Sequence, residues 1–175
     1  MLDGDHGTHD VQRVLDGLAA GRLRLAIAEG DTGGVLLEWL TALPGSSAGV
    51  LGGVVAYHDD LKRQLLGVSA ELLQRHGSVS AEVAEAMASG VRRLVGSDIG
   101  LATTGIAGPG GATPIKPVGL AFVAAAWGER TLVREHRWQG ERASNRAASA
   151  QAALRLALEL LGVLKMSKYR TDVLN

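Results

Sequence analysis

Residues 23–34 read LRLAIAEGDTGG, and this stretch indicates the fold class. Leu23 to Ala28 first alternates and then becomes continuously apolar, as is typical of a strand that enters a buried sheet. A Gly-rich turn follows, and Val35 to Leu43 has apolar positions at helical spacing until Pro44-Gly45 interrupts it. A buried strand, a turn and a helix in this order are characteristic of α/β domains.

The same alternation continues along the chain. Further strands are expected at 50–57, 99–106, 118–127 and 131–138, and helices at 11–20, 58–66, 70–76, 80–95 and 141–161. Gly128-Glu129 separates the last two strands and predicts a hairpin, so at least one strand is antiparallel. The residues therefore predict a three-layer α/β/α sandwich with helices on both faces of the sheet.

Length and composition limit the organisation of the chain. A chain of 175 residues that is 46% apolar is expected to form one domain. We place that domain at 11–162, with a mobile leader at 1–10 and a tail at 163–175 whose order the sequence does not decide. The start MLDGDHGTHD lacks the basic and apolar parts of a signal peptide, which favours a cytoplasmic location. The longest uninterrupted apolar run, 118–128, is far shorter than the ~20 residues of a membrane span.

Charge and cysteine content exclude several classes of function. The 18 basic and 18 acidic side chains balance, so the basic excess of a nucleic-acid-binding protein is missing. The chain has no Cys, which excludes disulfides, thiolate metal sites and cysteine nucleophiles. We expect no cofactor.

Two Gly-rich segments, 28–34 and 104–119, each follow a predicted strand, where α/β sheets bind their ligands. The backbone amides of the second segment can surround a phosphate; alternatively, the segment is a wide connection that needs positive φ angles. In the first segment, Asp31 or Thr32 is expected to cap the following helix. A second reading, compatible with the first, places Thr32 and the amides of residues 33–34 at a helix N-terminus that faces a ligand.

Polar residues gather where the second strand ends. Solvent exposure is the default expectation for them, but a partly desolvated Lys62 can act as a base and Tyr57 can donate or relay a proton. A divalent cation bound by Asp31, His58 and Asp59 is a further alternative, although their spacing does not place them on one face.

Seven stretches match one known pattern: AE..TGG at 28–34, PGSS at 44–47, GGVVAY at 52–57, Lys62, LLGV at 65–68, HG.VS at 76–80 and TGIAGPGG.TP.KPVG at 104–119. On these residues the chain resembles the CinA C-terminal, or nicotinamide-nucleotide amidase, family. The resemblance covers about residues 11 to 162, and its last motif is long and highly specific.

The resemblance implies a fold, an activity and an assembly. The fold is a three-layer α/β/α sandwich with a mixed, mostly parallel sheet of about five strands. The activity is hydrolysis of the carboxamide of nicotinamide mononucleotide to nicotinate mononucleotide and ammonia, without a cofactor. Similar proteins are often dimers, so a homo-oligomer is expected. Many relatives carry an additional N-terminal domain, and this chain is similar to the stand-alone form.

In the family the first turn reads AESCTGG, and its Ser is the implied nucleophile, activated by the residues that correspond to Lys62 and Tyr57. The chain departs from the family pattern at four places around the expected pocket: Gly30 for this Ser, Asp31 for Cys, His58-Asp59 for Ser-Asn, and Gly49-Val50 for aromatic residues. Loss of a serine nucleophile costs about a millionfold in turnover. The departures therefore favour lost or altered catalysis.

Three functions stand as alternatives: an amidase in which Thr32 is the nucleophile or Asp31 activates water, a silent nucleotide-binding domain, and a protein-interaction module. The expected ligand is a nicotinamide nucleotide or a related phosphate-bearing molecule. The candidate catalytic residues are Tyr57, Lys62, Asp31 and Thr32. The candidate ligand-binding residues are Glu29, Gly33, Gly34, Ser46, Thr104, Gly105, Gly108, Gly110 and Gly111.

Overall fold

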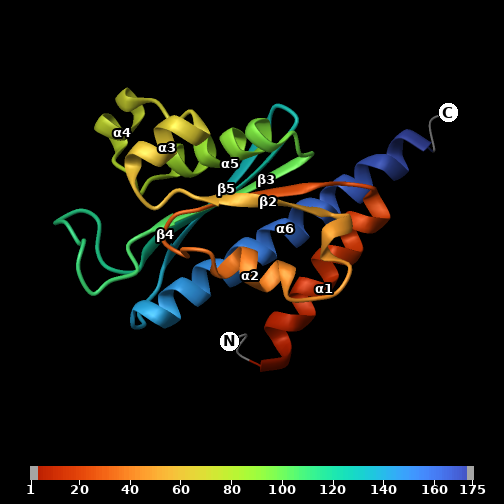
Figure 1. Ribbon diagram of the computed structural model, residues 1–175, viewed down its shortest axis with the longest axis horizontal. Helices are drawn as coiled ribbons and strands as arrows, with labels where there is room; N and C mark the ends of the chain where they lie inside the picture. The colour runs from red at the N-terminus through yellow and green to blue at the C-terminus, as the bar shows by residue number, and fades with distance from the viewer. Residues whose placement is uncertain (1–3, 173–175) are drawn as a thin grey trace.

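The computed structural model describes the backbone of residues 4–172 and the side chains of residues 7–164 (Figure 1). Its strands are β1 (Leu25–Glu29), β2 (Val50–Val55), β3 (Ile99–Gly105), β4 (Leu120–Trp127) and β5 (Arg130–Arg137). Its helices are α1 (Gly4–Gly21), α2 (Val35–Thr41), α3 (Asp59–Leu66), α4 (Ala70–His76), α5 (Ala81–Val95) and α6 (Arg142–Asp172), with a short 3₁₀ turn, η1, at Ser46–Ala48.

The strands form one sheet in the order β2-β1-β3-β4-β5. Strand β1 pairs in parallel with β2 and β3, whereas β3 pairs antiparallel with β4, and β4 with β5. Four strands therefore run in one direction and β4 runs in the other. The predicted mixed, mostly parallel sheet is confirmed, as is the hairpin, where Gly128 takes a φ of 51°.

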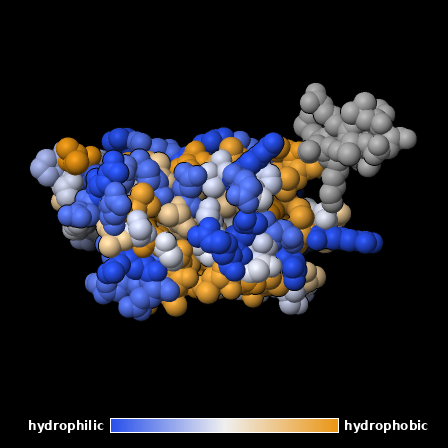
Figure 2. Space-filling view, turned by 90° about the horizontal axis from the view of Figure 1, so that it is seen from above, coloured by the Kyte–Doolittle hydropathy of each residue, from blue (hydrophilic) through white to orange (hydrophobic). Residues whose placement is uncertain are grey.

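Helices cover both faces of the sheet, with α1, α2 and α6 on one side and α3, α4 and α5 on the other (Figure 1). Alternate residues of β1 enter different cores, which explains why the strand is apolar throughout. We call these cores the α6 core, which includes Leu18, Leu25, Ile27, Leu154 and Leu160, and the α5 core, which includes Ala26, Ala28, Val83, Met87 and Phe122. Seen from above, the outer surface mixes hydrophilic and hydrophobic residues (Figure 2). The three-layer prediction is confirmed.

The turn between β1 and α2 is held by Glu29, which is 1% exposed. Its carboxylate accepts the backbone N–H groups of Gly34 (2.9 Å), Leu36 (3.1 Å) and Leu37 (2.8 Å), all in the first turn of α2. Glu29 therefore caps the helix, and the prediction that Asp31 or Thr32 does so is wrong. The carboxylate also complements the positive end of the helix dipole.

Two helices extend beyond the ends predicted from the sequence. Helix α1 begins at Gly4 rather than at residue 11, and Asp10 accepts hydrogen bonds from Arg13 (3.2 Å) and from Gln151 of α6 (2.7 Å). Helix α6 continues through Gly162, which does not take the positive φ of a helix-ending glycine. The backbone of the predicted tail is thus helical to Asp172, and residues 1–3 and 173–175 lie outside the described part.

The part of α6 that spans residues 142–164 is long enough and apolar enough to cross a membrane, by length and composition alone. Its apolar residues are interrupted by polar ones, so it contains no long uninterrupted apolar run. Ala150, Leu154 and Leu160 of this helix are fully buried in the α6 core. The helix also packs along α1 and across β3 and β4. Core packing therefore accounts for its apolar character.

Replacing Glu29 by Ala tests the cap on α2. We expect the free energy of unfolding to fall by about 2–3 kcal/mol, because one buried and two partly buried N–H groups lose their acceptor and each buried unsatisfied donor costs about 1–3 kcal/mol. Glu38→Ala is the matched control, because Glu38 lies in the same turn but is exposed. Urea denaturation should show a change of less than about 0.5 kcal/mol for the control; equal effects of the two substitutions would contradict the assignment.

Candidate functional site

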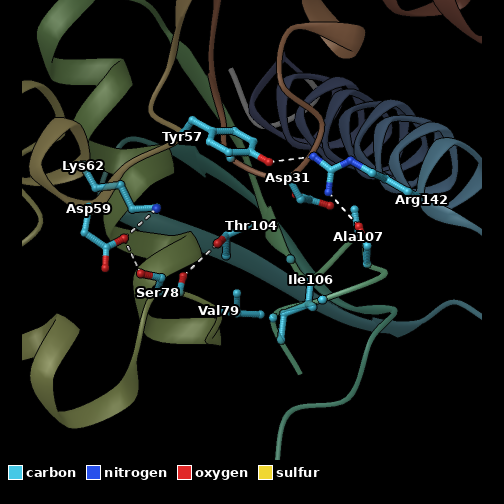
Figure 3. Close-up of a pocket in the computed structure, with 15 residues that line it drawn as sticks. Asp31, Tyr57, Asp59, Lys62, Ser78, Val79, Thr104, Ile106, Ala107 and Arg142 are labelled. Carbon is cyan, nitrogen blue, oxygen red and sulfur yellow. Dashed lines mark hydrogen bonds and ion pairs between the residues drawn. The ribbon is translucent and has the colours of Figure 1, made fainter. Parts of the chain in front are cut away.

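A cavity of about 250 Å³ lies at the carboxyl ends of β1, β2 and β3 (Figure 3). This is the edge of the sheet at which α/β domains bind ligands. The cavity is lined by Gly30, Asp31, Tyr57, Asp59, Lys62, Ser78, Val79, Thr104, Gly105, Ile106, Ala107, Gly108, Gly110, Gly111 and Arg142.

One wall of the cavity is built around Lys62 of α3, which is only 3% exposed. Its Nζ donates a hydrogen bond to Oδ1 of Asp59 at 2.8 Å, and the hydroxyl of Ser78 donates to the same oxygen. Burial acts to raise the pKa of Asp59, but the hydrogen bonds from Lys62 and Ser78 outweigh it, and the pKa lies below its ordinary value. Lys62 is therefore held in an ion pair, and its Nζ atom is already engaged by the carboxylate of Asp59.

Thr104 ties the same wall to the sheet. Its hydroxyl donates to the carbonyl oxygen of Ser78 at 2.8 Å and so joins the end of β3 to the segment before α5. The hydroxyls of both Ser78 and Thr104 thus donate to acceptors within the wall.

The opposite wall is organised by Arg142, the first residue of α6. Its guanidinium donates to the carbonyl oxygen of Gly108 at 2.8 Å and to the hydroxyl oxygen of Tyr57 at 2.7 Å (Figure 3). Arg142 therefore connects the Gly-rich loop after β3 to the end of β2. Our sequence reasoning missed this residue. A cation in the first turn of a helix opposes the helix dipole, and this unusual placement is the signal that could have identified it.

Gly30 follows β1 directly and continues its pairing with β3. Its N–H donates to the carbonyl oxygen of Thr103 at 2.9 Å. A Cβ atom at position 30 would lie 2.9 Å from that same oxygen, closer than such atoms normally approach. A side chain at position 30 therefore requires a small shift of the turn.

Asp31 follows directly and is 6% exposed. Its Oδ1 is closed to solvent and has no hydrogen-bond partner among the described residues, whereas its Oδ2 lies against Gly105, where a Cβ atom would be 2.8 Å away. Burial raises the pKa of Asp31, and the charge of Glu29 adds to the rise, against weaker opposing hydrogen bonds that involve Ser149 and Thr103.

The structure gathers part of the predicted site and leaves part of it outside the cavity. Gly30 and the candidates Asp31, Tyr57, Lys62, Thr104, Gly105, Gly108, Gly110 and Gly111 all line the cavity. The candidates outside its lining are Glu29, Thr32, Gly33, Gly34 and Ser46.

Thr32 is fully buried, and its hydroxyl lies 2.8 Å from that of Thr103. Ser46 lies in η1, outside the cavity lining. Glu29 accepts the amide N–H groups of Gly34, Leu36 and Leu37, so these three donors of the α2 N-terminus are already used within the fold.

The metal alternative also fails, because the three proposed ligands do not meet. Asp31 is buried in the β1–α2 turn, Asp59 is paired with Lys62, and His58 caps α3 by accepting the N–H of Asp60 at 3.3 Å. Among residues 7–164, no three His, Cys, Asp or Glu side chains lie close enough together to hold a metal ion.

Sequence comparison places residues 8–161 within the model of the CinA C-terminal domain. The chain is 49% identical over 139 residues to a putative competence-damage inducible protein of Desulforudis audaxviator, covering 79% of this chain and 34% of that protein. A CinA-like protein of Acidobacterium capsulatum is 48% identical over 130 residues, covering 74% of this chain and 31% of that protein. The chain thus spans about a third of the length of these relatives.

Solved structures of similar length share the whole fold. The competence/damage inducible protein CihA from Agrobacterium tumefaciens is 35% identical with a TM-score of 0.88, covering 93% of this chain and 99% of that protein. A CinA superfamily protein from Klebsiella pneumoniae is 32% identical with a TM-score of 0.86, covering 89% and 98% respectively. Sequence and fold agree: the chain belongs to the CinA C-terminal domain family.

Proposed function

We propose that the chain binds a phosphate-bearing nicotinamide nucleotide, or a related nucleotide, in this cavity, and that carboxamide hydrolysis is lost or strongly altered. The observation that carries the proposal is Gly30, which lines an otherwise well-built cavity at the position of the family nucleophile. A homo-oligomeric state and a cytoplasmic location belong to the same proposal.

The Gly-rich loop and Arg142 supply the means to bind a phosphate. Gly108 and Gly111 both take a φ of 90°, a conformation that favours glycine and leaves the backbone amides uncovered by side chains. Arg142 lies beside this loop and uses its NH1 and NH2 atoms on Gly108 and Tyr57. A guanidinium has five N–H donors, so Arg142 retains donors for an anion.

The hydrogen bonds within the cavity argue against an intact hydrolase. Hydrolysis with a serine nucleophile needs a hydroxyl group that lies next to a base able to accept the hydroxyl proton. Ser78 donates to Asp59, whose lowered pKa makes it a weak base, and Thr104 donates to a backbone carbonyl. The Nζ atom of Lys62, the implied base, is engaged by the carboxylate of Asp59. Binding without turnover is the function that these contacts support best.

Hydrolysis through Asp31 is the second candidate function. A carboxylate whose pKa is raised accepts a proton from water more readily near neutral pH than an ordinary one. Asp31 meets this condition and lines the cavity. It would then act on a water molecule rather than replace the missing nucleophile.

Calorimetric titration of the wild-type protein with nicotinamide mononucleotide, paired with an ammonia assay on the same sample, tests the proposal. We expect saturable binding and ammonia release at background. Turnover by the wild type would favour hydrolysis through Asp31, in which case Asp31→Ala should abolish it. Failure to bind would contradict the proposed function itself.

Gly30→Ser tests whether only the nucleophile is missing. We expect this variant to release ammonia faster than the wild type, and the further change Asp59→Asn to raise the rate at least about tenfold, because it removes the carboxylate that holds Lys62.

Gly30→Ala is the matched control, since it adds the same Cβ atom close to Thr103 without a hydroxyl. It should lose as much stability as Gly30→Ser and release no ammonia. If both serine variants bind the nucleotide but remain at background, the site has lost more than its nucleophile.

A further inference from the structure

We propose that Asp31 sets the head-group selectivity of the cavity: it accepts a neutral carboxamide and, as the pH rises, excludes the corresponding carboxylate. This inference rests on the proposed function and specifies which form of the nucleotide the same site retains.

The geometry builds the Asp31 carboxyl group into the cavity wall. Asp31 and Gly105 both line the cavity, and Oδ2 of Asp31 lies where a side chain on Gly105 would otherwise stand. A Cβ atom on Gly105 would also lie 3.0 Å from Cγ of Asp31. Figure 3 shows Asp31 on the same side of the cavity as Arg142, away from Lys62. The carboxyl group therefore forms part of the cavity wall and has little freedom to turn towards solvent.

The neighbouring elements supply no ion pair to Asp31 among the described residues. On α6, Arg142 donates to Tyr57 and Gly108, and Arg146 donates to the carbonyl oxygen of Thr32 at 3.0 and 2.6 Å.

The remaining charges near the turn do not compensate Asp31 either. Glu29, on the same turn, adds a negative charge, and Lys62 of α3 is paired with Asp59. Strands β3 and β4 contribute the neutral residues Thr103 and Ala121 beside Asp31 and Gly105. A buried carboxyl group in these surroundings is favoured in its protonated form.

Because Oδ1 is closed to solvent, Asp31 can reach a ligand only through Oδ2, which donates a hydrogen bond to a carbonyl or carboxylate oxygen while it carries the proton. A ligand carboxylate offers acceptors alone and adds a charge near Glu29. It can pair with Asp31 only while Asp31 keeps its proton. Deprotonated Asp31 still accepts an amide N–H group, so amide binding depends far less on pH. The ratio of the two affinities should therefore rise up to about tenfold per pH unit above the pKa of Asp31.

Calorimetric titrations with nicotinamide mononucleotide and nicotinate mononucleotide, from pH 6 to 9, test this inference. The phosphate group is common to both probes, so its ionisation cancels in the ratio of affinities. Asp31→Asn is the matched variant, because an amide side chain keeps a donor and an acceptor but does not titrate. In the wild type the amide-to-carboxylate ratio should grow with pH; in Asp31→Asn it should be constant. Paired buffers of different ionisation enthalpy should show proton uptake with nicotinate mononucleotide in the wild type alone.

The outcomes separate this inference from the proposed function. A wild-type ratio that is independent of pH, with both nucleotides bound, overturns the selectivity role and leaves the binding function intact. Absence of binding by either nucleotide at every pH removes the proposed function and, with it, this inference.

The protonation of Asp31 can also be measured without ligand. A pKa raised above the ordinary value of 3.8 means that the folded state binds the proton more tightly than the unfolded state. The stability that this proton contributes is fully present below pH 3.8. It is lost as the pH rises through the pKa that Asp31 has in the folded state. The stability of Asp31→Asn relative to the wild type should therefore increase between pH 3.8 and the pKa of Asp31 in the folded state, as measured in denaturant titrations. A stability difference that does not change with pH would show that folding does not raise the pKa of Asp31.

Discussion

The buried carboxylate of Glu29 is the constraint on which the rest of the site depends. A charge that is 1% exposed is tolerated because three backbone N–H groups of α2 surround it. This arrangement fixes the direction in which the chain leaves β1 and brings residues 30–31 against the end of β3. Because the cap comes from the strand, the side chain that caps the helix is not one of the turn itself.

The elements that could be predicted from the sequence are those with local signals. Apolar strands, the hairpin at Gly128 and the helices that end at Gly67 and Gly96 all follow from neighbouring residues. The start of α1 does not, because residues 4–10 show no apolar periodicity and Asp10 bonds to Gln151, 141 positions away. The role of Glu29 escaped prediction for a similar reason: an acidic residue at a strand end suggests ligand contact, and only the folded turn shows which donors surround it.

Some residues of the candidate site also have local sequence signals, and others do not. Tyr57, Lys62 and the loop that begins at Thr104 could be assigned because they lie at or shortly after the ends of predicted strands and match the family pattern. Arg142 and Ser78 lie just before or at the start of helices, where nothing local relates them to the sheet. Asp59, which the sequence offers as a candidate metal ligand, pairs with Lys62 in the structure. Three positions that depart from the family pattern, 30, 31 and 59, thus line one cavity: Gly30 has no side chain, Asp31 adds a carboxyl group and Asp59 pairs with Lys62.

The two walls of this cavity belong to different hydrophobic layers. Lys62 and Ser78 are carried by helices and segments that pack on the α5 core, whereas Arg142 begins the helix that fills the α6 core. The sheet separates these layers, and at this edge the hydrogen bond from Arg142 to Tyr57 joins the start of α6 to the end of β2. A molecule that contacts both walls would therefore act as a crosslink between the two halves of the domain. Its binding energy would be shared by both layers, so occupancy would make them melt together as a single cooperative unit.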